Sequence, residues 1–489
     1  MRKIFSISAC FIMLGLSTHA QNESDVILYT GHDYSGTARF SAMGSSFGAL
    51  GGDLSTLSTN PAGLGLYRSG EFTLTPAFIT SNSEAGYYGN VNEEGDFNFA
   101  LANIGYAQVY ELNSRKWKFG QFGFSYNRLR DFHTDYIIQG EQSQSSLLDF
   151  VATEAQNVPE DELADYDPFY IGPAYFAFLI NPFIDGSGGL FYDDVIPAGT
   201  PIDQEIAVSN RGRVSETVFA GSANYDDRLY IGVSMAFQRA VRDELMTFRE
   251  VVLDTAASEL EFFELNQDLE VRGDGINFKF GAIFRATDNV RIGGSYTTPT
   301  WYTFNNTWST DWYSEFDNGD VFQEPSFAVG ANQYNLRTPS RLLGSLGFVI
   351  AKQGLINIEY EYLDFSKAEF NRSGGSDINF TRENNEIARQ YAPVGNVRIG
   401  GEYRYNNFSV RGGYGFYPSP FEDGLQESSG DRSVYSGGVG YRKNRFNIDF
   451  TYRLNRFETD YYPYDPSIAE PAALTDRTHT VMTTLGFRF

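Results

Sequence analysis

The chain is 489 residues long and 42% hydrophobic, yet its mean hydropathy is only −0.34. It carries 62 acidic against 37 basic residues, and the net charge of −25 makes nucleic acid a poor partner. After the first twenty residues no apolar run is long enough to cross a membrane as a helix.

Residues 1–20 have the anatomy of a secretory signal peptide. Two basic residues precede an apolar segment from Ile4 to Leu16, and cleavage is expected after Ala20. The residues leading to Cys10 faintly resemble a lipoprotein box, but too little apolar sequence precedes them. Cys10 is the only cysteine, so the mature chain is expected to have no disulfide and a net charge of −27, from 35 basic and 62 acidic residues.

Residues 21–70 do not alternate between polar and apolar side chains, and they are rich in Gly, Ala and Ser, which allow tight helical turns. We expect Asp53 and Ser58 to cap short helices in this segment. Pro61 fixes one backbone angle and biases Asn60 away from the helical region, so Asn60 to Ala62 should form a rigid turn. This turn can belong to a plug, or it can simply lead the chain into the first strand.

From about Glu71 to Phe489 apolar and aromatic residues alternate with small, polar or charged ones. A soluble sandwich would also need a shared core and irregular crossovers, which the pattern lacks. The 42 phenylalanines and 32 tyrosines suit the two aromatic girdles of a membrane barrel. The predicted fold class is all-β, a 14-stranded antiparallel transmembrane β-barrel, with strands at about 71–80, 96–110, 117–133, 212–226, 228–250, 266–286, 289–307, 334–351, 354–371, 390–406, 408–418, 431–443, 446–461 and 478–489.

Short and long connections alternate along this region. Every even-numbered strand is followed by a short connection, such as Asn406–Asn407, and every odd-numbered strand by a longer one. Bacterial barrels have short periplasmic turns and long external loops, so both barrel termini should lie on the periplasmic side of a Gram-negative outer membrane. An even strand number closes the sheet without free edges, and we expect a monomer surrounded by outer-membrane lipid.

The longest connection is expected outside the cell, at about 134–211. It contains an amphipathic helix near 146–157 and then an aromatic stretch broken by prolines; a second short helix is expected at 260–265. The aromatic residues can form an external capture site for hydrophobic molecules, or the core of a lid over the barrel mouth. The candidate capture residues are Phe169, Tyr170, Tyr175, Phe176 and Phe178.

Charged side chains are expected on the lumen faces of the strands, and most should pair across neighbouring strands as wall structure. A guanidinium can bind a carboxylate bidentately, so Arg398 and Arg404 are the candidate site for a ligand head group. Gly120 and Gly123 in the third strand, and the glycines of 273–275 in the sixth, can kink a strand enough to open the wall or serve ordinary curvature.

Signatures of catalysis and metal binding are weak. The chain has no GxSxG, HExxH or phosphate-loop motif, and after signal removal its histidines are His32, His133 and His479. We therefore predict no enzymatic activity, no catalytic residue, no cofactor and no metal site.

Three pieces of sequence before the first strand carry a family resemblance, namely Ser35 to Gly44, Gly48 to Asp53, and Asn60-Pro61-Ala62-Gly63-Leu64-Gly65. Together they resemble the N-terminal hatch of the FadL/TodX family of outer-membrane transporters for hydrophobic molecules. The resemblance implies that residues 21–70 form a hatch inside the barrel of residues 71–489. It also implies that Asn60, Pro61 and Ala62 belong to a gate that rearranges when ligand binds.

The resemblance further implies a ligand similar to a long-chain fatty acid or an aromatic hydrocarbon, captured outside and released sideways into the bilayer through a gap in the wall. Diffusion-driven uptake is therefore the first functional prediction. The second is a docking or shuttle role with a secretion-system protein as partner, because some relatives in that family act in this way. The connection at 134–211 departs from the better-known members, whose large external elements lie elsewhere. An apolar path from loops to wall favours transport, whereas polar loops over a sealed lumen favour docking.

Overall fold

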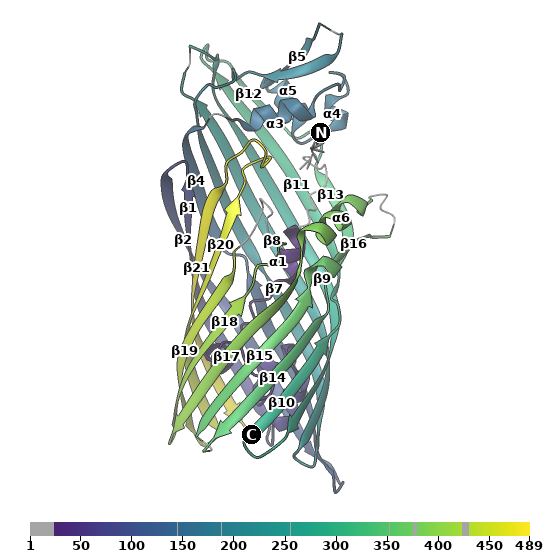
Figure 1. Ribbon diagram of the computed structural model, residues 1–489, viewed down its shortest axis with the longest axis vertical. Coiled ribbons are helices and arrows are strands. Elements are labelled where there is room, and N and C mark those ends of the chain that lie inside the picture. Colours follow the sequence, from purple (N-terminus) through teal and green to yellow (C-terminus); the bar gives the residue numbers. More distant parts are fainter. Residues whose placement is uncertain are drawn as a thin grey trace, which may run out of the picture.

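The computed structural model describes residues 24–143, 145–186, 188–254, 256–351, 353–374, 379–422 and 430–489. The predicted signal peptide lies outside these residues. The chain forms a tall barrel with short helices inside it and a small helical cap at one end (Figure 1). None of the helices in the described ranges is long and apolar enough to cross a membrane.

Fourteen antiparallel strands form the wall, as predicted, and the sheet closes where β1 pairs with β21 from Glu71 opposite Arg488 to Gly86 opposite Ala473. Four of the wall strands are interrupted and consist of two segments each. In order around the wall they are β1 (Glu71–Tyr87), β2 (Asn90–Glu111), β3 (Trp117–Asp131) with β4 (Thr134–Ser143), β7 (Ile202–Tyr225), β8 (Leu229–Val252), β9 (Leu260–Arg285), β10 (Val290–Thr297) with β11 (Trp301–Phe316), β14 (Arg341–Ile350) with β13 (Gly330–Arg337), β15 (Gly354–Asp364) with β16 (Glu369–Arg372), β17 (Pro393–Tyr405), β18 (Phe408–Tyr417), β19 (Arg432–Lys443), β20 (Phe446–Tyr461) and β21 (Ala472–Arg488).

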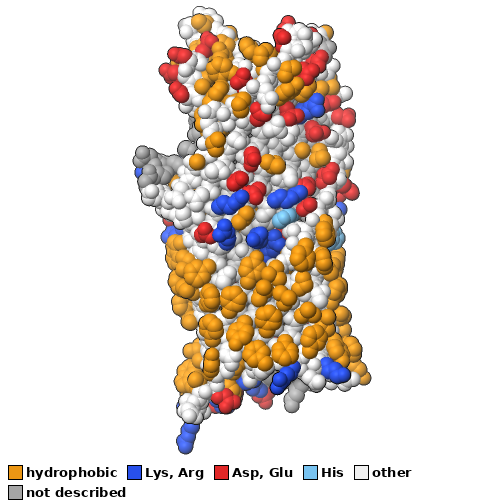
Figure 2. Space-filling view, turned by 180° about the vertical axis from the view of Figure 1, so that it is seen from behind, with side chains coloured by type: hydrophobic (Ala, Val, Ile, Leu, Met, Phe, Trp, Pro, Cys, Tyr) orange, Lys and Arg blue, Asp and Glu red, His pale blue; other side chains and the backbone are white. Residues whose placement is uncertain are grey.

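An apolar belt surrounds the lower part of the wall. On β8, for example, Val233 and Phe237 are exposed while Ser234 and Ala236 are buried. On the face shown in Figure 2 the belt is continuous and charged side chains begin directly above it. Tight turns and the C-terminus lie at the end nearest the belt (Figure 1), which identifies the periplasmic end.

The strands continue well above the belt, and here the predicted boundaries need correction. β1 and β2 are joined by a tight turn at Tyr88 and Gly89, both at positive φ, where a longer connection was predicted. β4 and the beginning of β7 are strands within the predicted connection at 134–211. The predicted helix at 260–265 is wrong, because these residues begin β9 and pair with β11. A register shift opposite Leu260 and Phe262 breaks the period-two pattern there, which concealed the strand.

The cap consists of α3 (Leu147–Glu154), α4 (Leu163–Tyr166), α5 (Ile171–Phe176), and a hairpin of β5 (Ile180–Ile184) and β6 (Leu190–Asp194). α3 confirms the helix predicted near 146–157, and Ser146 caps it in a capping box with Asp149. Leu148 and Val151 pack in one buried cluster with Phe248 and Trp312 of the wall. The remaining elements outside the lumen are β12 (Val321–Pro325), which pairs with β11, η3 (Phe365–Lys367) and α6 (Thr381–Gln390).

Candidate functional site

The N-terminal segment folds inside the lower barrel as α2 (Ala38–Ala42), η1 (Leu54–Ser58) and η2 (Pro61–Leu66) (Figure 1). Thr37 caps α2, and its hydroxyl also donates to the Asp53 carboxylate at 2.8 Å. Asp53 caps η1 by accepting from the Ser55 amide at 3.0 Å, as predicted. Ser58 is not a cap; it ends η1, and its hydroxyl accepts a 2.7 Å bond from Asn127 of β3. We call residues 31–70 the hatch.

The Asn60-Pro61-Ala62 turn is fully buried against the wall. The Asn60 amide donates to the Gly48 carbonyl at 2.7 Å and to the Ala282 carbonyl at 3.3 Å, and its oxygen accepts from the Ala62 amide. Wall glycines make this close approach possible. A Cβ at Gly281 would lie 2.0 Å from Asn60 Oδ1, and one at Gly232 would lie 2.4 Å from the Pro61 carbonyl carbon. The rigid turn is present; its role as a gate remains a prediction.

Buried ion pairs fasten the hatch to the wall. Arg39 of α2 contacts Glu402 of β17 at 2.9 Å, and Glu402 also accepts from Arg411 of β18 at 2.6 Å. Asp33 bonds Arg432 at 2.9 Å and also pairs with Arg453. Charge-assisted bonds between largely buried groups are strong, so the hatch is positioned by electrostatics as well as by packing.

The structure does not bring Arg398 and Arg404 together. Arg398 is fully buried and donates to Glu359 at 2.6 Å and to Glu361 at 3.1 Å. Arg404 is engaged by Glu402 at 2.5 Å. The Arg398 contacts are the cross-strand wall pairs that the sequence offered as the alternative, whereas Arg404 pairs with Glu402 along the same strand. A ligand carboxylate would have to displace a glutamate from either arginine.

A buried cluster of packed aromatic side chains lies above the hatch. Its rings are in near contact: the centroid of Phe304 is 5.1 Å from Tyr302 and 5.3 Å from Tyr334, and Tyr334 is 5.5 Å from Phe370. Tyr29 of α1 (Ser24–Thr30) packs into this cluster, with its ring 4.5 Å from that of Phe304. We define the aromatic chamber as Phe132, Tyr302, Phe304, Tyr334 and Phe370, all of which are buried.

The third wall strand holds α1 in place. Arg130 of β3 donates to the carbonyls of Ile27 at 2.9 Å and Leu28 at 3.1 Å. The Asp33 amide donates to the Leu129 carbonyl at 2.7 Å. The buried Thr30 hydroxyl has no partner within the described residues, and such a group costs about 1–3 kcal/mol. α1 is also bound to the opposite wall, because the Asp25 carboxylate accepts from Tyr334 of β13 at 3.3 Å and the Thr30 carbonyl accepts from Arg341 of β14.

The same strand interrupts the wall. β2 pairs with β3 from Glu111 to Asn103, but residues 90–102 of β2 pair with β1 alone, and β4 pairs with β7. β3 has a register shift between Arg128 and Arg130. Beyond this shift the third strand continues as β4, which packs against the β1–β2 hairpin. Ser83 of β1 and Thr134 of β4 meet there at 3.0 Å. We call this break between β2 and the third strand the seam.

Small apolar residues line the wall beside the seam. Ala77, Ala100 and Ala102 are buried in one cluster with Met482 and with Ala38 of the hatch. The candidate kinks do not open the wall: Gly120 and Gly123 stay paired with both neighbours, and residues 273–275 of β9 stay paired with β8 and β11, as ordinary curvature requires. The third strand does lose pairing, but at Arg128–Arg130, through a bulge rather than a glycine.

The predicted capture residues divide into two groups. Phe169 is buried, and its carbonyl accepts from Trp312 Nε1 at 3.2 Å, so it belongs to the interior of the cap. The hydroxyls of Tyr170 and Tyr175 bond Gln267 and Glu160, both at 2.7 Å. Phe176 and Phe178 are 43% and 51% exposed and contact Phe327 and Phe322, respectively. Only these last two face outward as a capture site requires.

The cap has a titratable carboxyl of its own. Burial raises the pKa of Asp194 in β6 to about 7 from the ordinary 3.8. Between these values the unfolded cap loses the proton while the folded cap keeps it, so the cap should become less stable as pH rises from about 4 to about 7. We expect the protection factors of the β5 and β6 amides, which correct for the intrinsic pH dependence of exchange, to be lower at pH 8 than at pH 5, and Asp194→Asn to remove most of this difference. An unchanged pH dependence in the variant would contradict this assignment.

Tyr29, Arg130 and the seam were not predicted from the sequence. A signal for the seam exists at 124–131. The outward positions Phe124 and Tyr126 are aromatic, but the next outward position, 128, carries the charge of an arginine. The inward position 129 is in turn an apolar leucine. This reversal of polarity indicates a bulge. Tyr29 gives no comparable signal, because a single tyrosine before the hatch has no periodic context.

A barrel with its N-terminal segment folded inside, a buried aromatic cluster above that segment and a break in the pairing of the wall define an outer-membrane transport barrel. Residues 219–462 match the family model described as outer membrane protein transport protein (OMPP1/FadL/TodX). The chain belongs to this family and is a protein of the Gram-negative outer membrane, as predicted.

Solved structures of similar fold cover almost the whole chain. A FadL homologue of Pseudomonas aeruginosa shares 12% identity over 94% of this chain and 99% of its own, with a TM-score of 0.57. The P. putida toluene transporter TodX shares 12% identity over the same fractions, with a TM-score of 0.53. A comparison with curated proteins finds no match. At these identities the likeness shows the fold.

Proposed function

We propose that the protein is a channel for diffusion-driven uptake of hydrophobic molecules, either long-chain fatty acids or aromatic hydrocarbons, with the hatch as its gate. The apolar interior supports this proposal most directly. The aromatic chamber and the hatch residues Phe40 and Phe47 form one buried cluster, and the alanine cluster beside the seam includes Ala38 of the same hatch. An aqueous pore would instead need polar walls at these levels.

The route has three stages. A hydrophobic molecule first meets Phe176 and Phe178 on the outside of the cap, then enters the aromatic chamber, and finally leaves through the seam into the bilayer. Each stage offers apolar surface, so movement follows the preference of the ligand for a non-aqueous environment. The protein-docking alternative required polar loops, whereas this cap exposes phenylalanines.

In the described state α1 stands where the ligand would bind. A helix of seven residues is not stable by itself, so α1 depends on the chamber and on Arg130. A ligand that fills the chamber better than Tyr29 can therefore displace α1. Because Arg130 lies at the seam, displacement of α1 also frees this residue of the strand that interrupts the wall from its bonds to Ile27 and Leu28.

Uptake by whole cells tests the gate. We expect cells with the protein to take up labelled oleate or toluene faster than cells without it, and Asn60→Ala to abolish the difference, because the turn loses its bonds to Gly48 and Ala282. Asn407→Ala, in an exposed periplasmic turn, is the matched control and should behave as wild type. Equal uptake of both compounds with and without a correctly inserted barrel would contradict the proposed function.

Tyr29→Ala should make the chamber more accessible to ligand. With the competing ring removed, we expect p-cresol or toluene to bind the purified protein about tenfold more tightly, because the bound state no longer has to displace α1. Calorimetry or the fluorescence of Trp308, which belongs to the same cluster, measures the affinity. Tyr29→Phe keeps the ring and should match wild type. Affinities for these ligands that are equal in the Ala and Phe variants would show that Tyr29 does not occupy the ligand site.

A further inference from the structure

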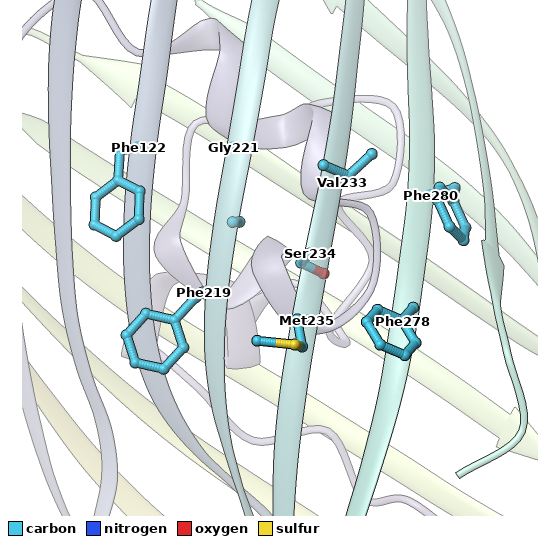
Figure 3. Close-up of a pocket in the computed structure, with 9 residues that line it drawn as sticks. Phe122, Phe219, Gly221, Val233, Ser234, Met235, Phe278 and Phe280 are labelled. Carbon is cyan, nitrogen blue, oxygen red and sulfur yellow. The ribbon is translucent and has the colours of Figure 1, made fainter.

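A shallow groove lies on the lipid-facing surface of the wall, across β3, β7, β8 and β9 (Figure 3). Its volume is about 400 Å³, and its rim includes Phe122, Phe219, Met235, Phe278 and Phe280. These side chains are 36–50% exposed, although they lie in the apolar belt. Gly221 creates the hollow, because a Cβ at this position would meet no atom within 4 Å. The groove is therefore open toward the bilayer and wholly outside the lumen.

Three arginines lie above this groove. β8 rises from Met235 through Phe237 to Arg239, which at about 3.3 Å per residue is about 13 Å along the strand. Arg213 of β7 and Arg272 of β9 both lie opposite Val241 of β8. Directly opposed residues of antiparallel strands share a face, so the three guanidiniums surround one small area of the outer surface. We call Arg213, Arg239 and Arg272 the arginine triad.

The triad is accessible, and the ion pairs of Arg239 and Arg272 with neighbouring acids are partly exposed. The side chains of Arg239 and Arg272 are 65% and 38% exposed. Arg239 contacts Asp274 at 4.0 Å, and Arg272 contacts Asp243 at 2.5 Å and Glu270 at 3.4 Å. Exposed pairs of this kind contribute little and can be exchanged for a stronger anion. No ion pair within the described ranges involves Arg213.

The position of the triad fixes the kind of ligand it can meet. The chain has 62 acidic and 37 basic residues, yet Lys and Arg side chains gather directly above the belt on the face shown in Figure 2. This level is the outer boundary of the outer leaflet, because the tight turns mark the opposite, periplasmic end. A molecule that reaches both the triad and the groove must have an anionic head at the surface and an apolar chain below it.

We propose that this surface binds a phosphorylated lipid of the outer leaflet, with its phosphate on the arginine triad and an acyl chain in the groove beside Gly221. Guanidinium groups match phosphate geometry through paired hydrogen bonds, and this selects an anionic head. The groove lies within the belt, where membrane lipid is the surrounding solvent, and this selects the acyl chain. The site is independent of the transported substrate and depends only on the location of the barrel in the outer membrane.

Native mass spectrometry of the full-length protein in detergent, with lipid A as the probe, tests the site. We expect an Arg213→Ala/Arg239→Ala double variant to bind lipid A at least tenfold more weakly. Gly221→Leu, which fills the groove and leaves the charges in place, should weaken binding by several fold. The matched controls are Arg337→Ala on β13, an arginine with a 47% exposed side chain at the belt edge, and Gly344→Leu on β14, another exposed glycine with open space around it. Both controls should bind as wild type.

Two further probes separate the lipid from a free anion. Dephosphorylated lipid A should bind the wild-type protein weakly. Its affinity should equal that of intact lipid A for the Arg213→Ala/Arg239→Ala variant. Inorganic phosphate at the same concentration should not displace lipid A. Equal binding of the phosphorylated and dephosphorylated lipids would overturn the role of the triad. Displacement of lipid A by inorganic phosphate alone, or full binding by Gly221→Leu, would overturn the role of the groove.

Discussion

Oxidation of a Ser83→Cys/Thr134→Cys double variant should stop uptake of hydrophobic molecules, and reduction should restore it. The two hydroxyls lie 3.0 Å apart, so the two thiols replace them within bonding reach. A disulfide would fasten β4 to the β1–β2 hairpin at the seam, where the described residues show no backbone pairing between them. If ligand leaves through the seam, we expect uptake in the oxidised form to fall at least tenfold. Uptake of labelled oleate or toluene with and without reductant measures the effect.

A second cysteine pair controls for cross-linking itself. Thr303 of β11 and Asn335 of β13 are directly opposed, and their side chains meet at 2.8 Å. These strands are already hydrogen bonded, so Thr303→Cys/Asn335→Cys should leave uptake unchanged in either redox state. Cys10 is the only native cysteine and lies in the predicted signal peptide, so each engineered pair is expected to be the only pair of thiols in the mature chain. Uptake that survives oxidation at the seam would place the exit elsewhere.

The wall was predictable because a membrane imposes a strict period. A strand between lipid and lumen must alternate between apolar and polar side chains, and every edge of a closed sheet must have a partner. The alternation of side chains and the spacing of turns therefore predicted the fourteen strands correctly. Above the belt this constraint ends. The inner face of β9 at Leu260 and Phe263 packs under the cap instead, and adjacent apolar residues then read as a helix. The same loss of constraint explains why β4 and the beginning of β7 were predicted as part of a connection although they are strands.

The interior was only partly predictable. Asn60-Pro61-Ala62 and the Asp53 cap are local features, determined by backbone chemistry within a few residues. The chamber is not local, because Tyr29, Phe132, Phe304 and Tyr334 come from four distant segments. Arg398 also depends on a distant segment: the sequence left it open as a head-group site or a wall pair, and the register of β15 and β17 places Glu359 directly opposite it. Cross-strand register decides which lumen charges remain available.

The seam and the hatch share the same residues, which couples the exit to the gate. Asn127 is the last β3 residue paired with β2, and its amide donates to Ser58 of the hatch. One residue further along, the Arg128 carbonyl accepts from Ser35 at 2.7 Å. The strand therefore exchanges bonds to β2 for bonds to the hatch at the point where the wall opens. A hatch that moves must first give up these bonds, so the strength of its remaining anchors controls opening.

Arg39→Met should release the hatch while the barrel stays folded. Arg39 joins α2 to Glu402 at 2.9 Å and to the Gly52 carbonyl at 3.1 Å, and it stacks on Phe47. Breaking a buried ion pair costs about 3 kcal/mol or more when it leaves a charge unpaired. Glu402 keeps Arg411, so most of the loss should fall on the hatch rather than on the wall.

The measurement is the conductance of single barrels in planar bilayers, with hydrogen exchange across residues 31–70. We expect Arg39→Met to conduct and to exchange faster in the hatch, while the wall strands stay protected. Arg404→Met is the matched control, because Arg404 also bonds Glu402 at 2.5 Å but lies on β17 rather than in the hatch. It should remain closed. A closed Arg39→Met barrel with a protected hatch would show that packing alone holds the hatch, and that the Glu402 contacts serve the wall.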